Sequence, residues 1–325
     1  MHKVLEDLGK TGIVPVITID DTEKAVPLAR ALVRGGIPCA EITFRTAQGE
    51  EAIRRIAKEM PEMLLGAGTV LNTGQVDRAI DAGAKFIVSP GLNPKVAAYC
   101  VRKGIPVTPG CANPSDIEQA LELGLEVVKF FPAEQAGGLE YIKAISAPYP
   151  ALKFMPTGGI NADNIAKYTA FDRILACGGS WMATADLIRA GEFEKITALS
   201  REAVLSIMGF QIAHIGINAN GEEAAARAAA LFGTLFGFVP KDGNGSIFAG
   251  DSIEVVKPSA EGHCAVGAHG HIAIGTNSIL RAMVYLERAG IVFGYASAKK
   301  DTKGNITSVY LKEEILGFAV YLEAV

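Results

Sequence analysis

One lysine, Lys129, lies inside the apolar run Val-Val-Lys-Phe-Phe-Pro of residues 127–132. Burial disfavours the charged form of lysine, and the neutral amine is the form that attacks a carbonyl carbon to make a Schiff base. Alternatively, a lysine at the end of a strand reaches solvent along its own apolar stem and has no chemical role. Its position alone does not separate these two interpretations.

Three polar residues, Glu41, Thr43 and Arg45, alternate with apolar residues along a second segment. Alternation in a β-strand places all three side chains on one face. A carboxylate on that face could transfer protons, and a guanidinium could hold a substrate carboxylate through two hydrogen bonds. The alternative is a buried Glu–Arg pair with a purely structural role, but such a pair is costly to bury without a function. We therefore expect these residues to form part of a site.

Two glycine-rich segments, Thr157-Gly158-Gly159 and Gly178-Gly179-Ser180, follow the last two predicted strands. Glycine lets the backbone approach an anion closely, so that amide groups near a helix start can hold a phosphate. Ordinary tight turns also use glycine. Two such segments on neighbouring strands favour a phosphate site, because barrels of parallel strands usually bind phosphate there.

The elements that must position these residues are eight predicted strands between residues 12 and 205, which alternate with segments of helical periodicity. This pattern is typical of a (β/α)8 TIM barrel, although a doubly wound open sheet gives a similar pattern. Polar or glycine-rich groups follow nearly every strand, and in a barrel these loops meet at the face that carries the chemistry. We therefore predict an α/β barrel over residues 1–208. The predicted strands are residues 13–17, 39–44, 64–68, 86–89, 106–108, 126–130, 153–156 and 173–176.

The remaining residues, 209–325, contain an internal repeat. The segment His-Ile-Gly-Ile-Asn at 214–218, followed by a helical segment, corresponds to His-Ile-Ala-Ile-Gly at 271–275, followed by another. Each copy closes with an apolar strand, at 252–256 and at 318–322. The repeat predicts a smaller α+β domain built of two βαβββ modules.

The repeat places His214 and His271 at equivalent positions of the two modules. Glu254 lies in an apolar strand, where a buried carboxylate needs a partner. Two imidazoles and a carboxylate can bind a divalent ion such as zinc, manganese, iron or nickel and leave positions open for substrate. His269 shares the face of His271 and could assist, and His263 lies in a polar stretch, but a non-functional role is favoured for both.

The composition bounds the function further. The 325 residues include 31 basic and 35 acidic ones, and the formal charge of -4 without a long basic run argues against a nucleic-acid partner. Five scattered cysteines without a CxxC pair favour reduced thiols. The amino terminus lacks the apolar stretch of a signal peptide, and the longest apolar run, 228–240, is too short to span a bilayer. We expect a cytoplasmic protein with no membrane partner.

Residues 1–205 resemble the 2-keto-3-deoxy-6-phosphogluconate (KDPG) aldolase family, also described as 4-hydroxy-2-oxoglutarate aldolase. The resemblance is carried by seven motifs that occur in order. The motifs are Pro-Val-Ile at 15–17, Glu-Ile-Thr-Phe-Arg-Thr at 41–46, Gly-Ala-Gly-Thr-Val at 66–70, Ser-Pro-Gly at 89–91, Lys-Phe-Phe-Pro-Ala-Glu at 129–134, Pro-Thr-Gly-Gly-Ile at 156–160 and Gly-Gly-Ser-Trp at 178–181.

The resemblance implies a role for each matching residue. Lys129 would be the Schiff-base lysine, and Glu41 would be the general acid and base. The substrate-binding residues would be Arg45, Thr69 and Thr157 around the pyruvate-derived carboxylate, Gly158, Gly159, Gly179 and Ser180 around the phosphate, and Pro90 and Phe131. The enzyme would cleave KDPG to pyruvate and glyceraldehyde 3-phosphate, or 4-hydroxy-2-oxoglutarate to pyruvate and glyoxylate, without a cofactor. The resemblance also implies a trimer formed through the barrels.

One segment, Cys-Ala-Asn-Pro at 111–114, departs from the family pattern and leaves the selectivity for the aldehyde open. Two other functions stay in consideration. The chain could be another phosphate-binding barrel, such as a thiamine-phosphate-synthase-like or isomerase barrel, but Lys129 within Lys-Phe-Phe-Pro argues against this. It could also be a sugar-acid sensor, against which the intact set of Glu41, Arg45 and Lys129 argues.

Residues 210–325 resemble the glyoxalase/vicinal oxygen chelate superfamily more loosely. The resemblance implies paired modules that form a cupped sheet around a metal ion, with His214, Glu254 and His271 at three ligand positions. The fourth position holds Tyr321, which leaves a three-ligand site, a shift to Glu323, or a scaffold without metal as alternatives. This domain would act on a related sugar acid or serve as a binding or assembly module.

Overall fold

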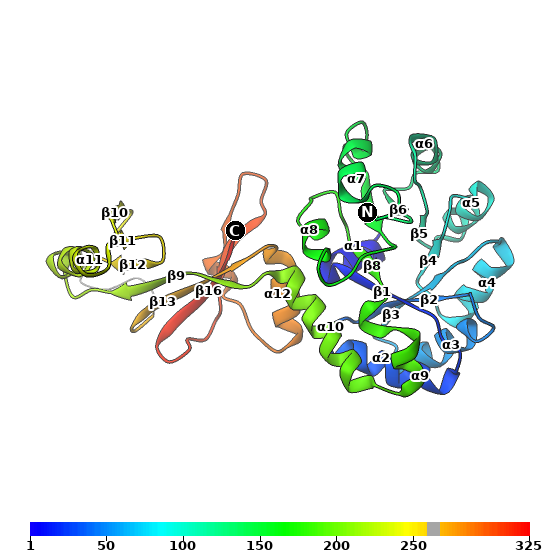
Figure 1. Cartoon of the computed structure of the whole chain (residues 1–325), viewed down its shortest axis with the longest axis horizontal. Helices are drawn as coiled ribbons and strands as arrows, with labels where there is room; N and C mark the ends of the chain where they lie inside the picture. The colour runs from blue at the N-terminus through cyan, green and yellow to red at the C-terminus, as the bar shows by residue number, and fades with distance from the viewer. Residues whose placement is uncertain (259–266) are drawn as a thin grey trace. The chain divides into compact units, whose positions relative to one another are not determined.

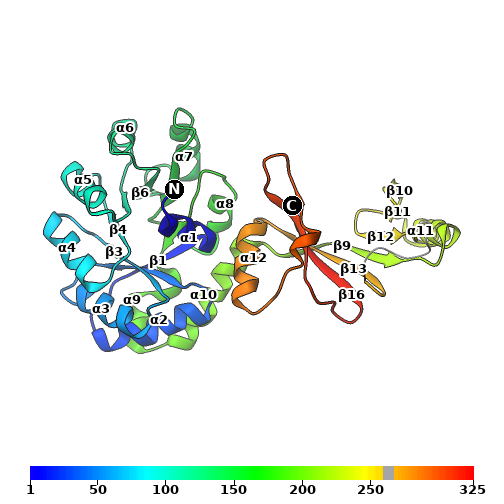
Figure 2. The same cartoon turned by 180° about the vertical axis from the view of Figure 1, so that it is seen from behind.

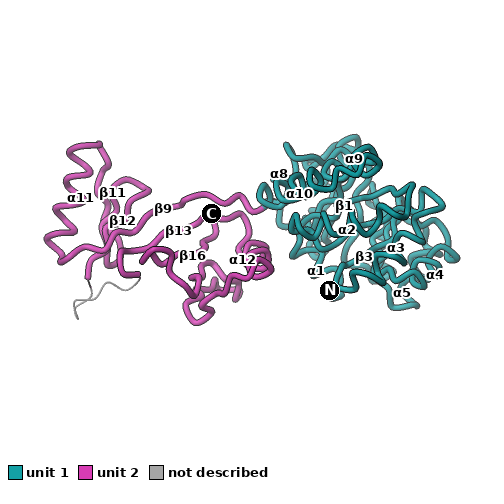
Figure 3. Tube along the Cα trace, turned by 90° about the horizontal axis from the view of Figure 1, so that it is seen from below, with its two compact units in different colours: residues 1–207 teal, residues 208–325 magenta. Residues whose placement is uncertain are grey.

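The computed structural model describes residues 1–258 and 267–325 (Figures 1 and 2). His263 and Cys264 lie outside the described residues. The chain divides into two compact units (Figure 3), which we call the barrel unit, residues 1–207, and the paired-module unit, residues 208–325. No helix in the described part of the chain is both long and apolar enough to cross a membrane.

The barrel unit is a closed ring of eight parallel strands. Six strands pair in the order β5-β4-β3-β2-β1-β8, and β6 pairs with β7. Bridges from Gly110 to Lys129 and from Thr157 to Gly178 join these two groups, so the ring closes. The predicted (β/α)8 barrel is therefore confirmed, and the pairing of β1 with β8 rules out an open sheet. The strands are β1 (Ile13–Ile17), β2 (Cys39–Thr43), β3 (Leu64–Gly68), β4 (Phe86–Ser89), β5 (Val107–Pro109), β6 (Val127–Phe130), β7 (Lys153–Pro156) and β8 (Cys177–Gly179).

Helices lie outside these strands (Figure 1). Local signals define several of their ends: Asn93 and Asn113 each accept a hydrogen bond from a backbone N–H of the first turn, with proline at the next position, and Gly104 ends a helix in the left-handed conformation. The helices are α1 (Lys3–Thr11), α2 (Ala25–Arg34), α3 (Gly49–Glu59), α4 (Thr73–Ala82), α5 (Pro94–Lys103), α6 (Pro114–Glu122), α7 (Gly138–Ser146), α8 (Ile165–Thr169), α9 (Ala185–Ala190) and α10 (Phe193–Met208).

The eighth strand lies elsewhere than the sequence predicts. We expect it at 173–176, with glycines following it, but β8 consists of Cys177 and the two glycines themselves. These glycines are required within the strand: a Cβ atom at Gly178 would lie 2.3 Å from the Thr157 hydroxyl, and one at Gly179 would lie 1.9 Å from the Trp181 ring. Glycine is depleted in strands, so the segment looks like a turn until its neighbours are known.

The paired-module unit contains the two predicted βαβββ modules. Their strands form one sheet in the order β10-β11-β12-β9-β13-β16-β15-β14, in which β9 and β13 pair antiparallel at the centre. The first module is β9 (Gln211–Asn218), α11 (Glu222–Phe236), β10 (Pro240–Gly243), β11 (Ser246–Ala249) and β12 (Ile253–Val256). The second module is β13 (Gly270–Thr276), α12 (Ile279–Arg288), β14 (Lys299–Lys300), β15 (Ile306–Tyr310) and β16 (Phe318–Ala324).

Helix α11 covers one face of the first half-sheet. Ala225 and Ala229 are buried against Val255 of β12, and these small side chains let the helix approach closely. Because side chains alternate along a strand, Glu254 points away from α11. The face opposite the helices is therefore available for polar residues.

Candidate functional site

Lys129 on β6 and Glu41 on β2 meet inside the barrel. The Lys129 Nζ lies 3.6 Å from Glu41 Oε1, and the residues are 4% and 1% exposed, respectively. The second carboxylate oxygen, Oε2, is buried and has no hydrogen-bond partner among the described residues. An amine that can attack a carbonyl thus lies beside a carboxylate with a free oxygen that can accept or return a proton.

Gly68 of β3 makes room for the Glu41 carboxylate of this pair, and Gly66 of the same strand makes room for a neighbouring ring. A Cβ atom at Gly68 would lie 2.0 Å from Glu41 Oε1, and one at Gly66 would lie 2.2 Å from the Phe86 ring. Both contacts are far shorter than van der Waals separation. Strand β3 therefore carries no side chain where it faces the Glu41 carboxylate.

A cavity of about 330 Å³ opens at the carboxyl ends of the strands. The Phe131 ring lines it, and the centroid of the same ring lies 5.2 Å from Lys129 Nζ, so Phe131 borders both the amine and the cavity. The complete lining is Val16, Thr18, Arg45, Phe131, Thr157, Gly158, Gly159, Ile160, Gly178, Gly179, Ser180, Ala183, Thr184 and Ala185.

Most of the predicted substrate-binding residues lie in this lining. Arg45 follows β2 as an exposed residue, and its Nε donates a hydrogen bond to Thr69 Oγ1 at 3.2 Å. Thr69 has a φ of 56°, a conformation that strains a β-branched residue and that holds its hydroxyl beside Arg45. Pro90 is exposed, and its carbonyl packs against Gly110 rather than lining the described cavity.

Thr18 is a cavity residue that the sequence reasoning misses. Its Oγ1 lies 3.0 Å from Oγ1 of Thr43, so a hydroxyl pair links the ends of β1 and β2. Thr18 is the first polar residue after β1, and the polar residues that follow the other strands provide the signal that could have identified it.

The segment that departs from the family pattern begins helix α6. The side chain of Asn113 accepts a hydrogen bond from the backbone N–H of Asp116, and Pro114 occupies the first turn. The backbone N–H of Cys111 donates to the carbonyl of Lys129, which ties the segment to β6. Burial raises the pKa of Cys111 to about 12, so its thiol stays protonated near neutral pH.

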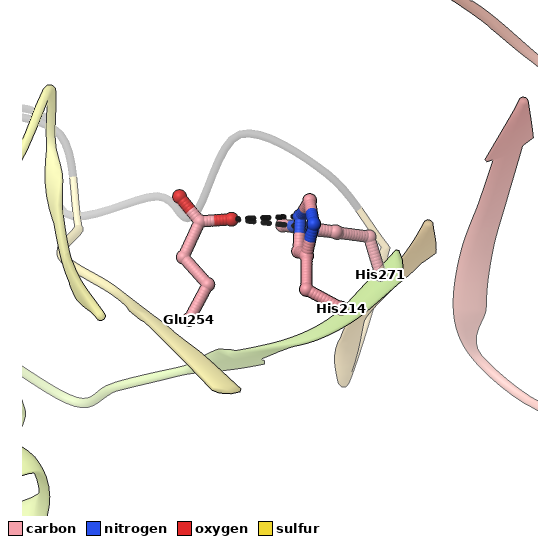
Figure 4. Close-up of side chains that lie close together, drawn as sticks. All are labelled: His214, Glu254 and His271. Carbon is pink, nitrogen blue, oxygen red and sulfur yellow. Dashed lines mark hydrogen bonds and ion pairs between the residues drawn. The ribbon is translucent and has the colours of Figure 1, made fainter. Parts of the chain in front are cut away.

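Three predicted metal ligands converge in the paired-module unit (Figure 4). The Nε2 atoms of His214 and His271 lie 3.2 Å apart. Oε2 of Glu254 lies 2.9 Å from the His271 nitrogen and 3.4 Å from that of His214. Hydrogen bonds from His214 and His271 hold the pKa of Glu254 well below its usual range.

The central strands explain why these side chains meet. His214 pairs with Ala273 across the β9–β13 ladder, and Gly216 faces both His271 on β13 and Glu254 on β12. A Cβ atom at Gly216 would lie 2.1 Å from the His271 ring. The missing side chain thus provides the space that the imidazole occupies.

Two residues of β16 extend this cluster. The Tyr321 hydroxyl lies 3.1 Å from His214 Nε2 and donates to Glu323 Oε2 at 3.3 Å. The other Glu323 oxygen lies 3.6 Å from His214 Nδ1. Burial, with the nearby carboxylate of Glu323, raises the pKa of Tyr321. His269 is exposed and packs beside Phe318, outside the cluster.

Comparison with known proteins relates this chain to aldolases over the barrel unit. The family model described as KDPG and KHG aldolase matches residues 4–199. The 2-dehydro-3-deoxy-phosphogluconate aldolase of Treponema pallidum is 52% identical over 209 residues, which are 64% of this chain and 99% of that protein. The KHG/KDPG aldolase of Escherichia coli K12 is 44% identical and covers 61% of this chain and 94% of its own length.

A solved structure of an aldolase is also similar to this chain. The KDPG aldolase of Legionella pneumophila, described with pyruvate captured at low pH as a covalent carbinolamine, is 37% identical with a TM-score of 0.61. The match covers 62% of this chain and 98% of that one. The sequence motifs, the barrel fold and the similar proteins all indicate the same family. The chain belongs to the KDPG and KHG aldolase family.

Proposed function

We propose that the barrel unit is a class I aldolase that cleaves KDPG to pyruvate and glyceraldehyde 3-phosphate, and 4-hydroxy-2-oxoglutarate to pyruvate and glyoxylate. The observation that carries this proposal is the buried amine of Lys129, 3.6 Å from the Glu41 carboxylate. The curated relatives carry the names of both activities, and the carbinolamine of the Legionella relative is the first covalent species of this chemistry.

The reaction follows from these two groups. The neutral Lys129 amine adds to the C2 carbonyl, and Glu41 donates the proton with which the carbinolamine loses water to form an iminium ion. Glu41 then accepts the proton of the C4 hydroxyl, the C3–C4 bond breaks, and its electron pair moves into the iminium. The aldehyde leaves, and the remaining enamine takes a proton at C3. Water hydrolyses the resulting iminium to pyruvate and regenerates the amine.

Residues that line the cavity, with Thr69 beside Arg45, bind the two ends of the substrate. Arg45, Thr69 and Thr157 hold the pyruvate-derived carboxylate, and Thr157 supports this role because its buried hydroxyl has no partner among the described residues. Backbone amides around the glycine segments hold the phosphate. The residues assigned to the phosphate are Gly158, Gly159, Gly179 and Ser180.

Borohydride reduction in the presence of pyruvate, followed by peptide mass mapping, tests the proposal. We expect one stable adduct on Lys129, and Lys129→Ala should remove both the adduct and nearly all KDPG cleavage. An adduct on another lysine would overturn the assignment. A phosphate-binding isomerase would give no adduct, and a sensor would bind KDPG without turnover.

For the paired-module unit, we propose a divalent metal ion held by His214, Glu254 and His271, as in the vicinal oxygen chelate proteins it resembles. Ligands about 2.0–2.1 Å from a tetrahedral zinc ion lie roughly 3.3 Å from one another, and the three donor atoms are 2.9 to 3.4 Å apart. When bound, such an ion acts as a Lewis acid toward an oxygen of a ligand.

Elemental analysis of the full chain after metal supplementation tests the metal proposal. We expect one ion per chain, which the double variant His214→Ala, His271→Ala should lose. Its absence from the supplemented wild-type protein would count against the site.

We also propose that the chain forms a trimer through its barrels, as the family resemblance implies. A designed cage built by fusing symmetric oligomeric domains is 29% identical over 61% of this chain, which supports association through this unit. Light scattering after size-exclusion chromatography measures the mass, and a monomer would contradict this proposal.

A further inference from the structure

A fourth donor oxygen lies beside the three predicted metal ligands. The Tyr321 hydroxyl is 3.1 Å from Nε2 of His214, which is itself 3.2 Å from Nε2 of His271. Tyr321 comes from β16, a different strand from those of the three predicted ligands. Its phenol oxygen is therefore as close to the His214 nitrogen as the three predicted donors are to one another.

Tyr321 and Glu254 occupy equivalent positions in the two modules, as the pairing of the strands shows. In the first module, Glu254 pairs with Gly216, two residues beyond His214 on the central strand. In the second module, Tyr321 pairs with Ala273, two residues beyond His271. The repeat thus supplies a histidine and an oxygen donor from each half, with a carboxylate in one and a phenol in the other.

The hydrogen bonds of Tyr321 leave its oxygen available on the side of the cluster. The hydroxyl proton points to Glu323 Oε2, so lone pairs of the phenol oxygen can face His214. Glu323 also lies 3.6 Å from His214 Nδ1. A carboxylate that contacts the outer side of two metal ligands orients both of them.

We propose that Tyr321 is the fourth protein ligand of the metal ion and that Glu323 is a positioning residue, not a ligand. This inference rests on the proposed metal function of the paired-module unit. The donor set becomes two imidazole nitrogens, one carboxylate oxygen and one phenol oxygen. Hard oxygen donors with imidazole suit zinc, manganese or iron rather than copper(I). If Tyr321 ligated a ferric ion, Glu323, which accepts the hydrogen bond of the Tyr321 hydroxyl, would take the phenol proton.

Iron provides a direct probe, because a phenolate bound to iron(III) gives a charge-transfer band in visible light. The full chain is stripped with chelator, loaded with iron(II) without oxygen, and oxidised by one equivalent of ferricyanide. Absorption and resonance Raman spectra then report on the phenolate, and elemental analysis reports separately on bound iron. The variants are Tyr321→Phe, which removes only the oxygen, and Tyr310→Phe, which removes the hydroxyl of the neighbouring ring, 4.7 Å away.

We expect the band in the wild-type protein and in Tyr310→Phe, and its complete loss in Tyr321→Phe. We also expect Tyr321→Phe to bind zinc roughly tenfold or more weakly, measured by competition with a chromophoric chelator. Glu323→Gln should shift or weaken the band but keep it. Stoichiometric iron without the band in the wild-type protein would overturn the inference and leave the metal proposal intact. Wild-type protein that binds neither iron nor zinc would contradict both the inference about Tyr321 and the metal proposal.

Discussion

At the scale of single residues, burying Lys129 and Glu41 costs free energy, and the proposed reaction uses both groups. Both groups are almost completely buried, and a charge left alone in such surroundings is strongly disfavoured. The 3.6 Å separation of Lys129 Nζ from Glu41 Oε1 keeps each group beside one of opposite charge. The same separation places the two groups of the proposed proton relay next to each other.

Glu41→Gln tests the relay. The amide keeps the shape of the side chain but cannot shuttle protons, so we expect kcat for KDPG cleavage to fall about 10²–10⁴-fold. The pyruvate adduct on Lys129 should still form, more slowly, under borohydride. The matched control is Glu140→Gln, since Glu140 is exposed and pairs only with Lys143 among the described residues. Wild-type kcat in Glu41→Gln would rule out the assigned role.

Two buried thiols predict a pH dependence of stability. Burial raises the pKa of Cys100 and of Cys111 from 9.0 to about 12. Because the folded pKa lies above the unfolded one, the stabilisation is fully present below pH 9.0 and is lost as the pH rises toward about 12. Urea unfolding at increasing pH should show this fall. The double variant Cys100→Ala, Cys111→Ala should show a shallower slope, and an equal slope would contradict the prediction.

At the scale of elements, strands position the site as much by omitting side chains as by presenting them. Gly68 on β3 leaves space for the Glu41 carboxylate, and Gly216 on β9 leaves space for the His271 ring. Neither glycine needs a left-handed backbone, so alanine could adopt the same conformation at both positions. Their function is to leave volume free.

Gly68→Ala should therefore inactivate the barrel without unfolding it. The added methyl group displaces the Glu41 carboxylate, and we expect kcat to fall at least about 10²-fold, as for loss of a general base. Circular dichroism and pyruvate binding would verify the fold. Gly74→Ala in α4 is the control, because its Cβ atom meets only Asn72 Oδ1 at 3.4 Å. Equal activity of the two variants would refute the steric argument.

The sequence predicts the elements better than their contacts. Periodicity and repeats identify the closed barrel and both βαβββ modules, because burial of one face leaves a pattern in neighbouring residues. The glycine strand β8 and the contact of Tyr321 with His214 depend on how distant strands pair in register. No spacing along the chain encodes that register, and the roles of the individual site residues stay predictions.

At the scale of the whole molecule, the barrel unit alone is as long as a related aldolase, and the paired-module unit follows it in the chain. The Treponema relative is matched over 99% of its length by 209 residues of this chain. Lys129, Glu41 and every residue that lines the 330 Å³ cavity lie within the barrel unit. The atoms assigned to the cleavage reaction are all supplied by that unit.

A protein truncated after Ile207 should therefore keep its aldolase activity. We expect kcat/KM for KDPG within a few-fold of the full chain, measured by coupling pyruvate release to lactate dehydrogenase. The same truncation carrying Lys129→Ala is the inactive control. A folded but inactive truncation, with native circular dichroism, would show that the paired-module unit contributes to catalysis.

The two halves of the eight-stranded sheet present different oxygen groups at equivalent positions, Glu254 in one and Tyr321 in the other. A carboxylate is anionic at neutral pH, whereas a phenol is neutral and can donate a hydrogen bond. The two sides of the His214–His271 pair are therefore chemically different, although the strands that carry them pair in the same way. The repeated backbone thus presents an asymmetric set of side chains at the centre of the sheet.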